Sequence, residues 1–287
     1  MATAAVSAPP RGRSRVLRVL LRRPSFVVAL SLLALLVFVA IAAPLVAPQD
    51  PTAQTLADRL QGPSAAHLLG TDNLGRDVLS RLIYAARLAL LAPLIAVGVA
   101  VLIGVPAGLV AGLSGGWVDS VTGRIFDTLL SLPGLAFALA VVAVIGPGLV
   151  NAMVAMGIVF APSLYRVVRG AALDVAAESY IESARAIGCS LRRVIWVHVL
   201  PNIAAPVLVQ VTILMGVALL AEASLSFLGL GVQPPNSSWG SMLQVAYQNQ
   251  YRAPLGVLPA GTALVLTVLS FNTIGDAVRD VVARRRS

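Results

Sequence analysis

The sequence contains no lysine, because all 21 of its basic residues are arginine. A phosphate-binding loop of the G-x-x-x-x-G-K-[ST] type needs a lysine to reach the phosphates, so this chain cannot hydrolyse ATP through such a loop. The single cysteine, Cys189, excludes an intrachain disulfide and any metal site built from several cysteines. Neither of the two histidines, His67 and His198, has a partner at ligand spacing, so we expect no metal site.

Charged side chains are also scarce. They make up 11% of the 287 residues, hydrophobic residues make up 58%, and the mean hydropathy is +0.88. A membrane crossing needs about 20 apolar residues. The uncharged stretches supply six crossings: 26–47, 88–118, two within 128–165 on either side of Gly146-Pro147-Gly148, 199–221 and 253–275. The composition therefore predicts an all-α integral membrane protein with six transmembrane helices.

The arginines are unevenly distributed along the chain. They cluster before the first crossing, in the segment 166–193 and in the C-terminal tail, while few lie in the other connections. Positively charged loops stay in the cytoplasm, so the pattern predicts that both termini are cytoplasmic. The net charge of +9 is then explained by membrane topology, and we expect no nucleic-acid partner. A basic tail that contacts RNA is the weaker alternative.

These crossings divide the chain into successive segments. The apolar residues of 77–86 recur at helical spacing and predict an interfacial amphipathic helix before the second crossing. The expected segments are a basic cytoplasmic segment 1–24, a first transmembrane helix 25–47, an extracytoplasmic segment 48–87, a core of five transmembrane helices 88–277 with a cytoplasmic loop 166–201 and an outer loop 229–253, and a basic cytoplasmic tail 278–287.

Two other classes of membrane protein can be tested against the residues. Gly112-Leu113-Ser114-Gly115 fits the surroundings of an intramembrane serine nucleophile, but no base accompanies the serine, so we interpret it as a turn that closes the second crossing. A secondary transporter places ionisable groups inside its crossings, and Glu222 is the one clear candidate. Either Glu222 is hydrogen-bonded to Ser224, Ser226 or a backbone group, or it faces a translocation path together with these serines.

One motif decides between the classes. The chain reads Tyr180-Ile181-Glu182-Ser183-Ala184-Arg185-Ala186-Ile187-Gly188 and continues to His198-Val199-Leu200-Pro201. It resembles the E-A-A-x-x-x-G-x9-I-x-L-P signature of permease subunits of binding-protein-dependent ABC importers. The matching residues are Glu182, Ala184, Gly188, Leu200 and Pro201, and the departures are Ser183 for alanine and His198 for isoleucine.

The same motif has a physical interpretation of its own. Two short helices joined at a glycine make a compact knob, residues 180–201, because Gly188 can adopt a positive φ that other residues avoid. A proline suits the first turn of a helix, so Pro201 is predicted to begin the fifth crossing. Small side chains at Ser183, Ala184 and Ala186 would let the knob enter a groove on a partner.

Three further stretches resemble the C-type permease of dipeptide, oligopeptide and nickel importers: 69–81, 116–119, and 221–235 with 238–240. The resemblance implies a type I ABC importer permease fold and a homologous B-type permease as partner. It also implies two ATPase domains that bind the ATP and Mg, and an extracytoplasmic binding protein. The chain itself would then have no catalytic residue and no cofactor, and would be a multi-pass protein of the cell membrane.

The resemblance also implies a role for the motif and a class of substrate. The residues expected to couple the chain to the ATPases are Glu182, Ser183, Ala184, Gly188, His198, Leu200 and Pro201. The expected substrates are di- and oligopeptides. The alternatives are nickel complexes or another small solute on the same fold, or an ATP-independent secondary transporter.

Overall fold

A computed structural model of the chain describes residues 20–283. The side chains of residues 182, 184, 185, 282 and 283 lie outside that description. The expected basic segment 1–24 and the last four residues of the expected tail 278–287 therefore lie largely or wholly outside the described residues.

The described residues form helices joined by turns, and an isolated β-bridge pairs Thr71 with Asp77. The α-helices are α2 (Pro24–Val46), α3 (Val78–Ser114), α4 (Gly116–Ser131), α5 (Gly134–Ile145), α6 (Leu149–Ala176), α7 (Ser179–Ala186), α8 (Leu191–Arg193), α9 (Leu200–Phe227), α10 (Trp239–Gln248) and α11 (Val257–Ala283). Short 3-10 helices, η1 (Leu56–Asp58) and η3 (Pro254–Gly256), and a π-helix, η2 (Val194–Val199), complete the chain.

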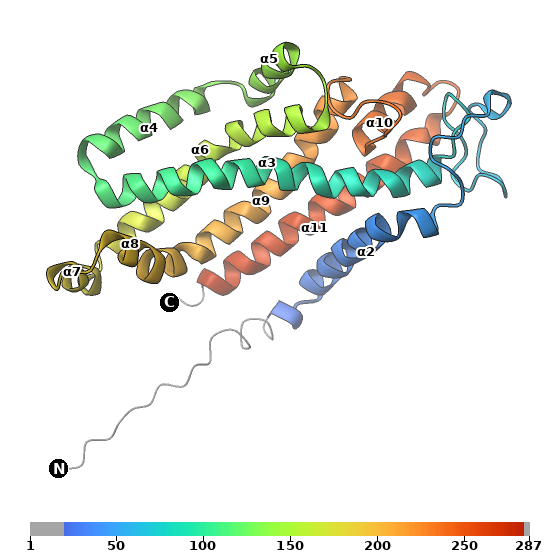
Figure 1. Cartoon of the computed structure of the whole chain (residues 1–287). Helices are drawn as coiled ribbons and strands as arrows, with labels where there is room; N and C mark the ends of the chain where they lie inside the picture. Colours follow the sequence, from blue (N-terminus) through green and yellow to red (C-terminus); the bar gives the residue numbers. More distant parts are fainter. Residues whose placement is uncertain (1–19, 284–287) are drawn as a thin grey trace.

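The candidate membrane passes are five helices and one bent helix pair, and Figure 1 shows how they are arranged in the bundle. Five are helices long and apolar enough to cross, namely α2, α3, α6, α11 and the run from α8 through α9. The sixth is the pair α4 and α5, which bends by 87° at its break. The expected helix before Gly146-Pro147-Gly148 is thus a broken crossing that starts at Gly116. Its break falls at Leu132-Pro133, because Pro133 cannot continue α4.

The bundle has two unlike ends (Figure 1). The knob, the start of α2 and the end of α11 lie at one end, where Phe26 packs with Ala277 and Arg23 pairs with Asp280 at 2.7 Å. The segment 47–77 and α10 lie at the opposite end. We call these the knob end and the loop end.

Helices α3 and α6 are the most closely packed pair, and glycines make this possible. Gly104, Gly108 and Gly112 lie four residues apart on α3, and a Cβ at Gly108 would come within 2.8 Å of the Tyr165 carbonyl oxygen on α6. Small residues at this spacing let two membrane helices approach until their backbones touch. This contact, which we call the α3–α6 seam, lies at the centre of the bundle, and the other helices are placed around it.

Helix α2 is attached to α3 through a polar contact that a proline creates. Pro44 lies inside α2 and has no N–H, so the carbonyl of Ala40, four residues earlier, has no helical partner. The Arg87 side chain of α3 donates its Nε–H to this carbonyl at 2.7 Å and lies 5.2 Å from the centre of the Tyr84 ring. The contact fastens the first pass at the loop end.

The amphipathic helix expected at 77–86 is the first part of α3, which continues without a break to Ser114. Asp77 caps it, because its carboxylate accepts hydrogen bonds from the Ser80 backbone N–H and hydroxyl at 2.8 and 2.7 Å. Ile83 and Ala86 are buried against protein, so this apolar face packs inside the bundle. The helix ends at Gly115 (φ 62°), and Gly112-Leu113-Ser114-Gly115 closes the second pass as expected.

Candidate functional site

The knob is built from two helical pieces that meet at a glycine. Helix α7 ends at Ala186, and the chain turns at Gly188, whose φ of 83° confirms the predicted positive value. Ser190 then leads into α8 and η2. A side chain at Gly188 would meet no atom within 4 Å, so the glycine is required by its backbone angle and not by crowding.

Pro201 lies in the first turn of α9, as predicted, but the helical backbone does not start there. The backbone is helical from Leu191 through η2 into α9, and Arg193, Val194 and Val199 all have α-region angles. A proline inside a helix removes one hydrogen bond and collides with the carbonyl four residues before it. The π-turns of η2 lie directly before Pro201, and wider turns of this kind accommodate such a missing bond. The knob is therefore continuous with the fifth pass.

The knob is anchored on the bundle by a few buried apolar residues. Ile181 of α7 and Val194 of η2 are fully buried in the same cluster as Val168 and Ala172 of α6. The rings of Tyr180 and His198 lie 5.9 Å apart. The Asn202 side chain donates to the Tyr180 hydroxyl at 3.1 Å, which joins α7 to α9. The knob is thus packed against the neighbouring ends of α6 and α9.

The knob also leaves apolar side chains exposed, and we refer to these together as its apolar face. Ile187 is 86% exposed and Trp196 is 66% exposed, and Leu191 and Val197 are exposed as well. Large apolar side chains that gather at a surface indicate an interaction site. This face is the part of the candidate site that sequence reasoning missed, although Val194-Ile195-Trp196-Val197 is an apolar run inside the predicted cytoplasmic loop.

The predicted coupling residues occupy different parts of the knob. Gly188, Pro201 and Ser183 are exposed, and the Ser183 hydroxyl donates to the Ser179 carbonyl at 2.9 Å. His198 and Leu200 are half-buried, Leu200 against the core. Glu182 and Ala184 lie in α7, and their side chains are outside the described part of the chain.

Glu222 lies at the other end of α9 and is enclosed by protein. It is 1% exposed, and the Ser226 hydroxyl donates to its Oε1 at 2.6 Å. Ser226 in turn accepts the Val232 backbone N–H at 3.0 Å, and Ser238 is a second hydroxyl beside the carboxyl group. Ser224 does not join this cluster, because it is partly exposed and donates to Leu220 of its own helix. In the isolated chain Glu222 therefore ties α9 to the loop before α10.

A polar cluster at the loop end was not assigned a role by the sequence analysis. Asp72 accepts from the backbone of Leu74 and Arg76 at 2.8 and 3.1 Å, and its Oδ2 lies 2.7 Å from Arg76 Nε and 3.5 Å from Arg81 Nε. His67 lies 3.0 Å from Asp77. The signal was present, because all of these residues fall within or beside the family-like stretch 69–81.

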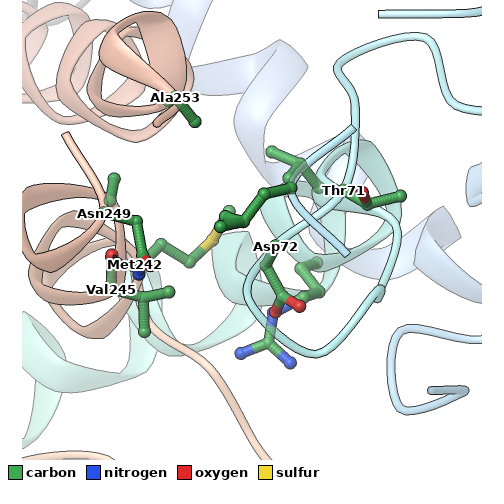
Figure 2. A pocket seen from close by; sticks show the side chains of 11 residues that line it. Thr71, Asp72, Met242, Val245, Asn249 and Ala253 are labelled. Carbon is green, nitrogen blue, oxygen red and sulfur yellow. Dashed lines mark hydrogen bonds and ion pairs between the residues drawn. The ribbon is translucent and has the colours of Figure 1, made fainter. Parts of the chain in front are cut away.

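Two cavities border this polar cluster. One, of about 50 Å³, lies between the segment around Thr71 and Asp72 and the face of α10 that carries Met242, Val245 and Asn249 (Figure 2). The other, of about 140 Å³, shares Arg81 and Val245 with it and is also lined by Arg76. The knob and these cavities are at opposite ends of the bundle, so the structure does not bring the two groups of residues together (Figure 1).

Nearby, the exposed start of the segment 47–77 is ordered by a small turn. The hydroxyl and the backbone N–H of Thr52 donate to Asp50 at 2.6 and 2.7 Å. These hydrogen bonds favour the ionised carboxylate and lower the pKa of Asp50 below its ordinary value.

Known proteins match both the sequence and the fold of this chain. Residues 104–287 match the family model for the inner membrane component of binding-protein-dependent transport systems, and residues 13–63 match the N-terminal transmembrane domain of oligopeptide transport permease C. The permease of the methionine ABC transporter MetNI, solved in inward-facing conformations, has a TM-score of 0.57 and 20% identity over 70% of this chain and 95% of its own. At that identity the match shows the fold.

Curated relatives cover nearly the whole chain. The dipeptide transport system permease protein DppC of Alkalihalophilus pseudofirmus is 42% identical over 256 residues, which are 89% of this chain and 84% of the relative. The di/tripeptide permease DppC of Pseudomonas aeruginosa is 42% identical over 86% and 84%. The glutathione permease GsiD of Shigella flexneri is 45% identical over 86% and 82%. The chain therefore belongs to the family of inner membrane permease components of binding-protein-dependent ABC importers.

Proposed function

We propose that this chain is the C-type permease subunit of an importer for small peptides, and that its knob receives the movement of separate ATPase subunits. The observation that carries the proposal is the exposed apolar face of Ile187 and Trp196 on a knob that is continuous with a membrane-crossing helix. Such a face needs a partner at the knob end, and the family supplies one in its ATPases.

The geometry supports a direct mechanical link. The helical run from Leu191 to Phe227 has 37 residues, so a displacement of the knob passes into α9 without an intervening loop. The buried Ile181 and Val194 make α7 and the inner end of α6 follow. Coupling by ATP requires two arrangements of the bundle that the partner binds differently. The other membrane passes would then move around the contact between α3 and α6.

The proposed function implies how the chain is oriented in the membrane and which other proteins it works with. The knob end is cytoplasmic, because Arg192 and Arg193 lie in α8 and Arg166 and Arg169 lie in the half of α6 that leads to the knob. ATP and Mg are held by the ATPase partners, and a homologous B-type permease completes the path. The loop end faces the binding protein on the outer side of the membrane. The chain itself contributes no catalytic residue.

Peptides are the substrate class that the relatives support. Two relatives are named for dipeptides or tripeptides and a third for glutathione, which is itself a tripeptide. Nickel complexes or another small solute on the same fold are the alternative. A secondary transporter is disfavoured, because the Glu222 carboxyl is closed in by Ser226 and lies 1% exposed instead of lining an open path.

Reconstitution tests the proposal. The chain and its B-type partner are placed in vesicles with or without the ATPases and the binding protein, and ATP hydrolysis and uptake of a labelled dipeptide are measured. We expect hydrolysis only with the ATPases, and uptake only with all components and ATP. Uptake by the permeases alone would favour the secondary transporter, and uptake of a nickel complex without uptake of the dipeptide would favour the alternative substrate.

A further inference from the structure

Two buried arginines at the loop end share a single carboxylate. Arg76 is 8% exposed and Arg81 is 6% exposed, and the Nε atoms of both point to the same oxygen, Oδ2 of Asp72, at 2.7 and 3.5 Å. Arg81 also donates to the Pro51 carbonyl at 3.4 Å. Both guanidinium groups therefore lie in one small, buried region of the protein.

The two guanidinium groups have a single carboxylate as their ion-pair partner, Asp72. Asp77, the next carboxylate along the chain, bonds His67 and Ser80 at the start of α3 instead. The Glu222 carboxyl group accepts a hydrogen bond from Ser226. A buried charge without a partner is costly, so the arrangement favours the arrival of a second anion.

The arginines are held in place before any ligand arrives. The backbone of the segment folds around Asp72, which accepts from Leu74 and Arg76, and the Gly75 N–H donates to the Asp72 carbonyl at 3.1 Å. The Gly75 backbone packs on Thr55, where no Cβ would fit. A site whose donors are already fixed loses little freedom on binding, which favours affinity.

The cavity of about 140 Å³ is where such an anion would bind. Arg76 and Arg81 line it from one side, and the loop before α10 and α10 itself line it from the other. The polar side chains on that second side are Gln233, Asn236, Ser241 and Gln244. The smaller cavity of Figure 2 shares Arg81 and Val245 with it. The volume suits one small planar group, and arginine binds a carboxylate through two parallel hydrogen bonds.

We propose that this cavity is a carboxylate-binding site of the permease. The site itself follows from the charges and the cavity, and only the source of the carboxylate rests on the proposed function. A peptide brings its C-terminal carboxylate to the loop end, and a binding protein that docks there brings acidic side chains. Both sources present the same chemistry to Arg76 and Arg81.

The first experiment tests the site and does not depend on transport. The complete purified importer is heated with sodium N-acetylglycinate, or with N-acetylglycinamide and sodium chloride at the same ionic strength. We expect the carboxylate alone to raise the melting temperature in a saturable way. Arg81→Gln should weaken this binding roughly tenfold or more, because it removes a charge-assisted pair of hydrogen bonds.

Two further variants control for folding and for general charge. Arg59→Gln removes an exposed arginine of the same segment and should leave the carboxylate effect unchanged. If Arg81→Gln does not assemble, Arg81→Lys keeps the charge but not the fork of donors, and should assemble with weakened carboxylate binding. An equal shift in all variants, or no shift in the wild type at any concentration, would overturn the proposal.

The second experiment identifies the source. One arm compares a dipeptide with its C-terminal amide in the melting assay, and the other measures the affinity of the ligand-free binding protein for the importer. If the peptide is the source, the dipeptide but not the amide protects, and Arg81→Gln removes the difference. If the binding protein is the source, Arg81→Gln weakens docking by roughly tenfold. If neither arm responds to Arg81→Gln, the site has no role in either step and the proposal fails, even where uptake confirms the proposed function.

Discussion

The two ends of the bundle are built on different principles. At the loop end the segment 47–77 has little helix, yet it is held by side chains that bond the backbone, such as Asp72, and by buried charges. At the knob end the backbone is almost entirely helical, but apolar side chains such as Ile187 and Trp196 are left open. The irregular end is held by buried polar contacts around Asp72, whereas the knob is held by a few buried apolar residues and leaves Ile187 and Trp196 open.

The difference indicates how each end of the bundle is held together. Backbone bonds and helix caps inside the loop end require no outside group, so this end can act as a rigid frame. An exposed apolar face gains stability when a partner covers it. Each end contains a glycine with a positive φ, Gly75 and Gly188, and these two residues allow the comparison to be tested directly.

The largest effect is expected at Gly75. Its φ is 72°, and a Cβ there would overlap the Thr55 carbonyl group, so Gly75→Ala adds both backbone strain and a clash with main chain. We expect a loss of about 3 kcal/mol or more, seen as poor assembly and a sharply lower melting temperature.

Gly62→Ala is the matched control for Gly75→Ala, because it lies in the same segment with open space around it and should leave the melting temperature unchanged. A Gly75→Ala protein as stable as the wild type would show that the loop end is not a rigid frame.

The next largest effect concerns the uncovered face of the knob. Trp196→Ala removes a large apolar side chain that contacts little of its own chain, so the bundle should keep its stability. If the face docks on an ATPase, the loss of a central aromatic side chain costs about 2 kcal/mol, or roughly thirty-fold in affinity. The measurement is the binding of detergent-solubilised permease pair to the ATPases.

Trp117→Ala is the control for this measurement, since Trp117 is also an exposed tryptophan but lies at the start of α4, outside the knob. Equal binding by the wild type and Trp196→Ala would assign the ATPase contact to another surface.

Much of this comparison could be predicted from the sequence. The membrane passes could be predicted from the long uncharged stretches, because a bilayer requires helices of a set length. The positive φ of Gly188 could be predicted from its position between two short helices. Context adds to two of the local rules. Pro201 lies in the first turn of α9 as expected, but α8 and η2 continue the helical backbone before it, and 77–86 is the start of α3 instead of a separate helix.

Other features could not be obtained from local patterns. The Asp72 cluster joins Arg76 and Arg81 across a turn that depends on Gly75 packing against Thr55, twenty residues earlier in the chain. The role of Arg87 depends on a carbonyl that Pro44 leaves free on another helix. The α3–α6 seam is different, because the four-residue spacing of Gly104, Gly108 and Gly112 is visible in the sequence.

A moderate effect is expected at the outer end of α9. Ser226→Ala removes the donor to Glu222 and the acceptor for the Val232 N–H, which leaves two buried polar groups without this partner. The cost should be about 2 kcal/mol in thermal unfolding. Glu222→Gln keeps the shape and a hydrogen-bonding oxygen, so we expect normal assembly and a smaller loss.

Ser224→Ala is the matched control for Ser226→Ala, because its hydroxyl bonds only the carbonyl of Leu220 one turn earlier and should be replaceable at little cost. Reduced peptide uptake in a Glu222→Gln protein of unchanged stability would contradict a purely structural role and place the carboxyl on the path.

The smallest effect on stability is expected at Gly188, which makes it the counterpart of Gly75. Its φ of 83° is as unfavourable for a side chain, but nothing lies within 4 Å of the Cβ position, so Gly188→Ala brings strain without a clash. The cost should be about 1 kcal/mol and confined to the knob, since few buried residues tie the knob to the bundle. The melting temperature should barely change, while ATP hydrolysis stimulated by the loaded binding protein falls about fivefold, because the strained turn holds the apolar face away from its docking position.

Gly188→Val should lower the stimulated rate further, because a β-branched residue resists this φ more strongly. If both variants keep full stimulated hydrolysis, the shape of the knob does not set the coupling, whereas a collapse in stability as large as that of Gly75→Ala would show that the knob end is as firmly built as the loop end.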